Sequence, residues 1–505
     1  MSYVLFILLS LVIILVALLY LLGALRRRGP NEPPLDTGYL PWFGHVLSFQ
    51  RNTEQFLQEM QKKYGDIFTV QLAGCYITFL MDPISYGAVM KVSRSKLDFK
   101  KFAFELAERV FGFHAKQPDH KLLEGISNKQ LMGDGLVVLT QAMMINLQKV
   151  MLHRTADFTR EWKQDGLFNY CYNIVFRAGY LSLFGNEPTK GDQDRANKLD
   201  RENSEQLYYE FRKYDRLFPR LAYAVLPPKE KLEVERLKRL FWSLLSVQKM
   251  RNREQTSGWV TELQRQMDEE GVHLDMQSRY MFLLLWASQG NTGPSAFWVL
   301  LSLYRSPKAL NAVRAEVDEL LAQTGQQATT DGPLVNLTRD MLQKTPVLDS
   351  AVEESLRMYA APLLSRTVME DFELSMADGW RYLLRKGDRV AVFPHLSIHM
   401  DQELHPRLHS FQFDRFLNAD GTKKMDFYKR GQKLKYYNMP WGAGISMCPG
   451  RFFATNELKQ FVFLMLCYFD FELVNPEEDI PPIDRWGFGI MQPTYDVQFR
   501  YRFRC

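Results

Sequence analysis

The sequence is poor in cysteine, and its few cysteines are far apart. There are five, and no two of them form a C-x-x-C pair: Cys75, Cys171, Cys448, Cys467 and Cys505. An odd and scattered set is typical neither of a disulfide scaffold nor of a zinc knuckle, and it favours a reducing compartment. We therefore expect no disulfide framework.

An excess of charge of one sign is also lacking. The chain has 63 Lys and Arg against 58 Asp and Glu, and the net charge of +5 is too small to indicate a protein that binds nucleic acid. It contains no G-x-x-x-x-G-K-[ST], no G-x-G-x-x-G between a strand and a helix, and no H-E-x-x-H. Phosphate-loop, dinucleotide-binding and zinc-hydrolase functions are therefore disfavoured. Two histidine pairs at i, i+4 spacing lack the neighbouring Glu of a zinc hydrolase, and we interpret them as ordinary loop or surface residues.

Only one stretch near the N-terminus has the composition of a membrane anchor. Residues 3–25 contain no charged side chain, and a helix of this length crosses a hydrocarbon layer of about 30 Å. A cleaved signal peptide has its basic residues before a shorter apolar centre, whereas arginines at 26–28 follow this one. We predict a single-pass transmembrane signal-anchor at 1–25 and a catalytic domain at 39–505 in the cytosol. The basic and proline-rich residues 26–38 are expected to be a stiff linker that lifts this domain off the membrane.

Helical spacing dominates the remainder of the chain. The length of 505 residues exceeds what one core usually supports, so one large domain or two fused lobes are expected. Alternating β-branched and aromatic residues around a glycine turn predict a hairpin at 65–83, and short strands are expected at 389–394 and at the C-terminus. The predicted fold class is mainly α with small β-sheets. Apolar periodicity predicts helices over 54–63, 135–151, 229–249, 278–304, 307–321 and 346–358.

Cys448 lies in a setting that indicates chemistry. The stretch MPWGAGISMCPGRFFATNE places it between glycine-containing turns and the start of an apolar helix. A lone cysteine in a reducing compartment is more often buried and structural. Here, however, Gly442, Gly444 and Gly450 allow close backbone approach, and a sulfur at a helix N-terminus faces unpaired amides that favour the thiolate. We interpret Cys448 as a metal ligand.

Three motifs, in the expected order, resemble those of the cytochrome P-450 family. PWGAGISMCPGRFFA is similar to its cysteine-ligand loop, with Trp441 where Phe is usual. EESLRM supplies its E-x-x-R as Glu354 and Arg357, and FDRF, which contains Arg415, is similar to its later P-E-R-F element. The resemblance implies a cytochrome P-450 fold that binds haem b, with Cys448 as the axial thiolate. It also implies that Glu354, Arg357 and Arg415 brace the ligand loop as a charge-assisted cluster.

Haem carries two propionates, whose partners are only partly recognisable. Arg366, in APLLSRTV, matches a family position that serves this purpose. Two residues before the cysteine the family often has Arg or His, whereas this chain has Ser446, and the W-x-x-x-R of an early helix is missing from residues 120–135. The other propionate partner stays open, with Lys129 as a candidate. The cofactor-binding residues that we expect are Cys448, Trp441, Gly442, Gly450 and Arg366.

The apolar segment 278–304 is predicted to be a buried helix next to the cofactor. A second membrane span is disfavoured, because the polar centre at 288–292 is costly in lipid. Glycines and a proline within 290–294 weaken its hydrogen-bond ladder. The resemblance identifies it as the helix over the haem, where the family usually has an acidic residue before Thr. Thr292 keeps a hydroxyl that can order water and relay protons, whereas Asn291 cannot ionise, and both are predicted to be catalytic.

Departures from the common motifs indicate which branch of the family the chain resembles. The phrases LWASQGNTGP, AGYLSLFG, TPVLDS and RWGFGIMQP resemble the branch that holds sterol 7α-hydroxylase, sterol 12α-hydroxylase and prostacyclin synthase. The resemblance implies first a 12α-hydroxylase of bile-acid precursors such as 7α-hydroxycholest-4-en-3-one, in the endoplasmic reticulum membrane. It would use O2 and electrons from NADPH, delivered by NADPH-cytochrome P-450 reductase. Two alternatives stay open: a prostacyclin synthase-like endoperoxide isomerase, and a sterol 7α-hydroxylase-like oxysterol hydroxylase.

A lipid-soluble sterol requires an apolar pocket. We predict that Trp286, Ser288 and Phe488 line it, together with an early loop at 102–113. Residues 216–231, apolar and bounded by prolines and lysines, resemble the loop that contacts the bilayer at the substrate entrance.

A run of basic residues precedes the ligand loop. Our hypothesis is that it helps to dock an acidic surface of the reductase, and an ordinary solvated loop is the alternative. The run consists of Lys423, Lys424, Lys429, Arg430, Lys433 and Lys435.

Overall fold

The structure, a computed structural model, describes residues 2–114, 120–152, 161–329 and 332–504. Contacts between Cα atoms divide the chain into two compact units. Unit 1 consists of Met1–Ala103, Ala361–Leu408 and Asp426–Met447, and unit 2 consists of Phe104–Ala360, His409–Met425 and Cys448–Cys505. The predicted ligand loop changes unit within its length, because Met447 ends the last stretch of unit 1 and Cys448 begins the last stretch of unit 2.

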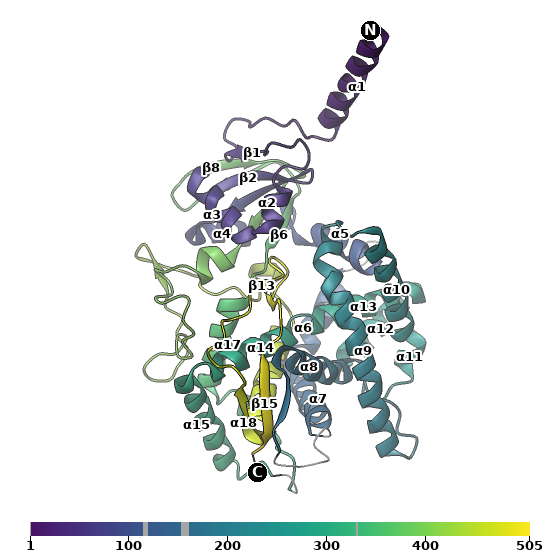
Figure 1. Cartoon of the computed structure of the whole chain (residues 1–505), viewed down its shortest axis with the longest axis vertical. Coiled ribbons are helices and arrows are strands. Elements are labelled where there is room, and N and C mark those ends of the chain that lie inside the picture. Colours follow the sequence, from purple (N-terminus) through teal and green to yellow (C-terminus); the bar gives the residue numbers. More distant parts are fainter. Residues whose placement is uncertain (1, 115–119, 153–160, 330–331, 505) are drawn as a thin grey trace. The chain divides into compact units, whose positions relative to one another are not determined.

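Unit 1 is built around a mixed sheet with the strand order β1-β2-β3-β9-β6-β4. The hairpin predicted at 65–83 is confirmed as the antiparallel pair β2 and β3, whose turn contains Gly74 at φ +77°. A Cβ on Gly74 would come within 2.4 Å of the Trp42 ring nitrogen, so only glycine fits there. The elements of unit 1 (Figure 1) are α1 (Ser2–Leu21), β1 (Leu35–Asp36), α2 (Val46–Arg51), α3 (Thr53–Tyr64), β2 (Ile67–Leu72), β3 (Cys75–Leu80), α4 (Tyr86–Met90), β4 (Leu97–Asp98), β6 (Leu364–Val368), β7 (Phe372–Ser375), β8 (Arg381–Leu384), β9 (Arg389–Val392), β10 (Tyr428–Lys429) and β11 (Gln432–Lys433).

Helix α1 is apolar on every face, which is typical of a helix in lipid. Residues Tyr3–Leu21 are long and apolar enough to span a membrane, and none of this stretch is buried in the structure. The residues predicted to form a stiff linker after α1 contact unit 1 at several points. Arg26 Nη1 lies 2.6 Å from Asp388 Oδ2, the Arg28 Nε donates to the Glu32 carbonyl at 2.9 Å, and β1 pairs with β2. The linker is therefore part of unit 1, held there by ion pairs and by sheet hydrogen bonds.

Unit 2 is mainly helical, as its apolar periodicity predicts. Helix α14 lies at its centre and packs against α8, α13, α15, α17 and α18. Its Trp298 is fully buried, stacks on Tyr359 with ring centroids 3.8 Å apart, and donates its ring N–H to the Met491 carbonyl at 2.8 Å. Because α8, α14 and α18 are apolar on nearly every face, they form the core of this unit.

The remaining elements surround that core (Figure 1). A small antiparallel sheet has the order β12-β15-β5. The elements of unit 2 are α6 (His120–Gln130), α7 (Gly133–Met151), β5 (Lys163–Gly166), α8 (Leu167–Phe184), α9 (Gln193–Ala222), α10 (Pro228–Leu244), α11 (Val247–Arg251), α12 (Gly258–Glu269), α13 (Leu274–Gln289), α14 (Thr292–Tyr304), α15 (Pro307–Gln323), α16 (Arg339–Leu342), α17 (Pro346–Tyr359), α18 (Arg451–Tyr468), β12 (Phe469–Leu473), β13 (Ile483–Asp484), β14 (Gln492–Pro493) and β15 (Gln498–Phe503).

Two segments that were predicted to be loops are helical. Residues 102–113 lie largely in helix α5 (Phe99–Phe111). Helix α9 continues to Ala222 through Pro219, so only the last part of 216–231 before α10 is a connection. A proline removes one helical hydrogen bond, and the buried apolar face of α9 keeps the helix intact beyond that point. Tyr223, Val225 and Leu232 are exposed around this connection, which fits contact with a lipid surface.

Candidate active site

Cys448 lies directly before helix α18, whose N-cap is Gly450. The first amides of a helix have no acceptor within the helix, and here the amides of Gly450 and Arg451 donate to the Cys448 sulfur. A Cβ on Gly450 would lie 3.9 Å from that sulfur, so the glycine leaves space beside it. The thiol is free and partly exposed. These features fit a sulfur that can bind a metal.

The start of α18 favours the thiolate as expected, but burial of the thiol outweighs that effect. Burial raises the pKa of the Cys448 thiol, and the amides of Gly450 and Arg451, with the charge of Arg451, only partly oppose that effect. A coordinating metal removes the proton of a thiol outright. The sulfur is therefore expected to be a neutral thiol before a metal binds and a thiolate once a metal coordinates it.

The turns that precede Cys448 belong to unit 1. Gly442 has φ +73° and Gly444 has φ +66°, in the left-handed region where glycine is favoured. A Cβ on Gly444 would come within 2.8 Å of the Met90 carbonyl oxygen, so the backbone there approaches a neighbour closely. Trp441 is partly exposed in the same turn. The glycine pattern thus fixes the path of the loop, as the sequence indicates.

Arg366 is a buried cation on strand β6 in unit 1. It is 7% exposed, and its Nη2 lies 3.5 Å from the Ala443 carbonyl oxygen and 3.6 Å from the Met90 sulfur. Among the residues that the structure describes, no carboxylate pairs with it, and burial lowers the pKa of its guanidinium. A buried guanidinium without an anionic partner fits an anionic ligand group such as a haem propionate. Lys129, in contrast, is exposed at the end of α6.

Glu354, Arg357 and Arg415 are brought together as the sequence predicts. Glu354 and Arg357 are fully buried on α17, and the Nε atoms of Arg357 and Arg415 each lie 2.8 Å from Glu354 Oε2. The amide of Gln412 donates to the other carboxylate oxygen at 3.1 Å. Both carboxylate oxygens are therefore satisfied, and the cluster binds the segment at 409–425 to α17.

The helix predicted over 278–304 is broken into α13 and α14 at the expected place. Asn291 separates the two helices, with φ −116°. The cause is visible at Gly293, where a Cβ would lie only 2.2 Å from the ring of Tyr172 on α8. The close approach of α8 requires glycine, and Pro294 removes a further amide from the ladder. The polar centre of the segment is thus at a true interruption of the helix.

Asn291 and Thr292, at the break, have different partners. The Asn291 Oδ1 accepts a hydrogen bond from the Ile490 amide at 3.0 Å, and the structure assigns its Nδ2 no partner among the described residues. The Thr292 hydroxyl donates to the Ser288 carbonyl at 3.4 Å and lies against the carboxyl of Glu457. The side chain with a free donor is therefore Asn291.

The three predicted pocket residues lie in unit 2 and are partly exposed. Trp286 stacks on Phe218 with ring centroids 4.0 Å apart, and Phe488 meets the same Phe218 ring edge-on at 5.4 Å. Ala287, between Trp286 and Ser288, is exposed, whereas its neighbours at 281–289 are buried or half-buried. The Ser288 hydroxyl is bonded to the Leu284 carbonyl at 2.8 Å. Trp286, Phe218 and Phe488 therefore form an aromatic wall. Ser288 does not offer a free hydroxyl there, because its hydroxyl is bonded within α13.

Sequence reasoning missed two buried carboxylates of unit 2. Asp215 binds the ring N–H of Trp286 at 3.3 Å. Glu457, on α18, is 1% exposed, and burial raises the pKa of its carboxyl well above the usual range, with Thr292 acting in the opposite direction. A signal was present for Glu457, because an acidic residue interrupts the otherwise uncharged stretch at 452–458. No comparable signal marks Asp215, which lies in a helix rich in charge.

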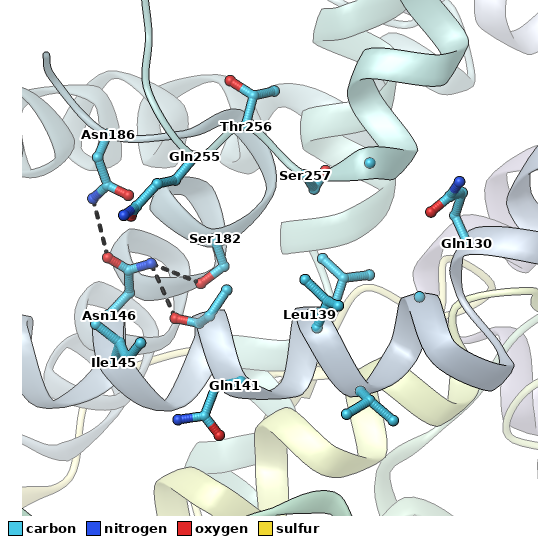
Figure 2. Close-up of a pocket in the computed structure, with 15 residues that line it drawn as sticks. Gln130, Leu139, Gln141, Ile145, Asn146, Ser182, Asn186, Gln255, Thr256 and Ser257 are labelled. Atoms are coloured by element: carbon cyan, nitrogen blue, oxygen red, sulfur yellow. Dashed lines mark hydrogen bonds between the residues drawn. The ribbon is translucent and has the colours of Figure 1, made fainter.

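A cavity of about 660 Å³ lies elsewhere in unit 2, along α7, and none of the predicted site residues line it. Figure 2 shows Asn146 at its wall, within hydrogen-bonding distance of Ser182 and Asn186 at 3.2 Å each. All of its lining residues are uncharged. Asn146 and Asn186 are bonded to each other, and the lining offers no ionisable group for chemistry.

Much of the basic run at 423–435 is paired with carboxylates. In unit 2, Lys423 pairs with Glu353. In unit 1, Lys429 pairs with Asp401, Lys433 with Asp426, and Arg430 lies 3.6 Å from Asp66. Pairing reduces the positive field that this run offers to an acidic surface. The docking hypothesis is weaker than the sequence alone indicates.

Comparisons with known proteins agree with these features. A family model described as Cytochrome P450 matches residues 33–500. The chain is 48% identical over 498 residues to a pig (Sus scrofa) protein named 5-beta-cholestane-3-alpha,7-alpha-diol 12-alpha-hydroxylase, with 98% of this chain and 97% of the relative covered. It is 47% identical to the human 7-alpha-hydroxycholest-4-en-3-one 12-alpha-hydroxylase, with the same coverage. Human prostacyclin synthase is 43% identical over 485 residues, with 94% of this chain and 95% of that protein covered.

Proposed function

The chain belongs to the cytochrome P450 family and is a monooxygenase, and from that premise we propose that it hydroxylates 7α-hydroxycholest-4-en-3-one, or a closely similar sterol, at the 12α position. The observation that carries this proposal is the nearly full-length similarity to 12α-hydroxylases, which is higher than the similarity to prostacyclin synthase. The reaction would consume O2, NADPH and a proton for each sterol and would yield the hydroxysterol, NADP⁺ and water.

The family implies a haem-thiolate cofactor, and several of the predicted residues have features that fit it. Bound haem supplies the iron that activates O2, with electron donation from the axial thiolate. Cys448 would be that ligand, since its sulfur is accessible and held by two amides. Gly450 leaves room beside the sulfur, and Trp441 and Gly442 shape the preceding turn. Arg366, a buried cation that no carboxylate of the described residues pairs with, would bind a propionate.

Asn291 and Thr292 would have unequal roles in proton delivery. The Asn291 amide has a free donor that can orient a water molecule. The Thr292 hydroxyl is engaged with Ser288 and Glu457, so its role would be to hold the helix break. We therefore assign the catalytic contact to Asn291 and a positioning role to Thr292. This assignment differs from the expectation that the Thr292 hydroxyl itself relays protons.

The sterol would bind against the aromatic wall of Trp286, Phe218 and Phe488, with Ser288 at its margin. Flat apolar ligands bind mainly through such surfaces, with few polar contacts. The exposure of Ala287 among buried and half-buried neighbours supports an open space at this place.

The N-terminal apolar helix fits a single-pass membrane anchor. The membrane would be the endoplasmic reticulum, with the body in the cytosol, because the arginines that follow α1 favour that side. NADPH-cytochrome P-450 reductase would supply the electrons. A membrane location also suits a substrate that dissolves in lipid.

The test is product analysis with two substrates. Membranes that contain the protein are incubated with 7α-hydroxycholest-4-en-3-one, reductase and NADPH, and separately with prostaglandin H2 without reductase or NADPH. We expect an NADPH-dependent 12α-hydroxysterol, which mass spectrometry identifies. Rapid rearrangement of the endoperoxide without any sterol product would overturn the proposal and favour a prostacyclin synthase-like isomerase. A 7α-hydroxylated product from another sterol would favour an oxysterol hydroxylase.

Two cysteine variants make the cofactor assignment testable in the same preparation. Cys448→Ser removes the only sulfur proposed as the ligand, so the carbon monoxide difference band of the haem-thiolate should vanish. Cys75→Ser, at a partly exposed free cysteine of unit 1, is the matched control and should keep the band. Loss of the band in both variants would indicate misfolding instead of loss of the ligand.

A further inference from the structure

Asp215, on α9, is a buried carboxylate with an unusual number of partners. Its side chain is 0% exposed. Arg485 Nη1 lies 2.7 Å from both of its oxygens, and Arg212 Nη1 lies 2.8 Å from Oδ2. Tyr172 O–H and Gln492 Nε2 donate to Oδ2 at 3.2 and 3.1 Å, and the Trp286 ring N–H donates to Oδ1 at 3.3 Å. These donors come from α8, α9, α13 and the segment at 485–492.

The carboxylate is ionised in this setting. Burial alone would raise the pKa of Asp215, but the charges of Arg485 and Arg212 and the hydrogen bonds from Arg485 and Gln492 outweigh it and lower that pKa. A buried anion that binds two cations is costly to disturb, because removal of one partner leaves the others without compensation. The Asp215 carboxylate is therefore held firmly in place in unit 2.

Asp215 holds two of the residues that are proposed to line the sterol pocket. Trp286 is bonded to Asp215 directly. Phe488 lies in the turn between β13 and β14. Arg485, before Phe488 in the chain, and Gln492, after it, both bind Asp215. Arg485 itself has φ +78°, a left-handed conformation that is costly for a non-glycine residue. The bonds to Asp215 offset that cost and hold the turn.

The aromatic rings complete the connection. The Arg485 guanidinium lies 5.5 Å from the Phe218 ring centroid and 5.8 Å from that of Trp286, close enough for cation–π attraction. Phe218 contacts both Trp286 and Phe488. One ionic centre thus lies behind an aromatic wall whose members come from three separate segments.

We propose that Asp215 is a positioning residue for substrate selection, because with Arg485 it sets the placement of Trp286 relative to the Phe488 turn. It does not touch the sterol. This inference rests on the proposed function, since it takes Trp286 and Phe488 as walls of the sterol pocket. If the ionic centre is removed, the wall should lose its shape while the haem site on α18 remains.

The test uses the double variant Asp215→Asn with Arg485→Gln, which removes both charges. Asparagine keeps the size of Asp215, and glutamine keeps a hydrogen-bonding amide on a shorter side chain. Haem loading is measured first from the carbon monoxide difference spectrum. Dissociation constants are then measured by absorbance titration for imidazole, which needs only an accessible iron, and for clotrimazole, whose aromatic body also needs the wall. We expect clotrimazole to bind about tenfold more weakly, as when one well-packed aromatic contact is lost, with imidazole binding unchanged. With the sterol, KM should rise and the 12α share of the products should fall.

Asp200→Asn is the matched control. Asp200 is also a buried carboxylate on α9, and it pairs with Lys149 at 3.0 Å and with Arg253 at 3.8 Å, away from the aromatic wall. Its loss should reduce stability without changing the ratio of the two azole affinities. The same ratio in the double variant as in the wild type would overturn the inference.

Other outcomes are also decisive. If the double variant does not take up haem, Arg485→Lys keeps the charge, loses the planar donor geometry, and should change the azole ratio in the same direction by a smaller factor. An unchanged ratio there would likewise contradict the inference. If the wild type forms no 12α-hydroxysterol, the proposed function fails, but the azole ratio still tests the role of Asp215.

Discussion

Arg415 donates its Nε to Oε2 of Glu354 at 2.8 Å, and so it binds the segment at 409–425 to helix α17. Glu354 is fully buried and also accepts the Nε of Arg357 at 2.8 Å. Two guanidinium groups therefore share one carboxylate in a region from which water is excluded.

Glu354→Gln should be among the most damaging single changes in unit 2. The amide keeps the shape of the side chain but leaves two buried arginines without an anion, which costs about 3–5 kcal/mol for a broken buried pair. We expect loss of most haem incorporation, measured by the carbon monoxide difference spectrum, and a lower thermal midpoint of the fraction that folds.

The neighbouring Glu353→Gln is its control. Glu353 pairs with Lys423, whose side chain is 55% exposed, and such pairs contribute little. Equal losses in both variants would indicate that any change in this part of α17 disturbs the fold, and the special role of the Glu354 cluster would be refuted.

The cluster was predictable from sequence because its spacing is local and its chemistry is simple. Glu354 and Arg357 lie on one face of a helix at i, i+3, and Arg415 follows in a recognisable motif. Cys448, with its glycines and the helix after it, was readable for the same reason. The broken helix at 288–294 was also predictable, since glycine and proline interrupt an apolar run.

Other features depend on contacts between residues far apart in the chain, which a single sequence does not reveal. Asp215 and Arg485 are separated by 270 positions and meet at 2.7 Å. The docking of residues 26–38 depends on Asp388. Which of Asn291 and Thr292 has a free donor depends on how the helix break rotates the two side chains. Residue type favours the Thr292 hydroxyl as the relay and does not reveal that this hydroxyl contacts the Glu457 carboxyl.

Asn291→Ala should uncouple the reaction more than Thr292→Val. Asn291 loses the amide donor that we assign to water orientation, whereas Thr292→Val keeps the branched shape at a hydroxyl that is already engaged with Ser288. The measurement is the amount of NADPH consumed per hydroxysterol formed, with hydrogen peroxide determined in parallel. We expect this ratio to rise roughly tenfold or more for Asn291→Ala, within the range of lost proton-transfer contributions.

Stronger uncoupling in Thr292→Val than in Asn291→Ala would indicate that the Thr292 hydroxyl relays the proton. A third variant, Asn291→Gln, separates chemistry from packing, because it keeps the amide but moves it by one methylene. Partial recovery of coupling in that variant would support the donor role of the amide.

Glu457→Gln should change the pH dependence of stability. Burial raises the pKa of this carboxyl in the folded protein, so the folded chain keeps a proton that the unfolded chain releases above about pH 4.3. Stability of the wild type therefore falls as the pH rises from there towards the folded pKa, by at most about 1.4 kcal/mol per pH unit. Glutamine has no such proton to release, so the stability of the variant should increase relative to that of the wild type as the pH rises.

The measurement compares apparent thermal midpoints of wild type and Glu457→Gln at pH 5.5 and pH 8. Glu477→Gln, at an exposed position, is the control for the loss of a carboxylate. A constant difference between Glu457→Gln and the wild type at the two pH values would mean that Glu457 ionises in the folded protein, against the burial argument.

Two N-terminal deletions should separate anchoring from folding. Removal of residues 2–21 takes away α1 alone, and it leaves Gly23, whose carbonyl accepts the Tyr76 hydroxyl at 2.6 Å, and Arg26, which is paired with Asp388. This form should move from the membrane pellet to the supernatant at high salt with an unchanged thermal midpoint. Removal of residues 2–28 also deletes Arg26 and leaves Asp388 without that cation, at a cost of about 1–3 kcal/mol, so it should be released but less stable. If the shorter deletion still sediments with membranes, the exposed Tyr223, Val225 and Leu232 form a second contact with the bilayer, and α1 is not the sole anchor.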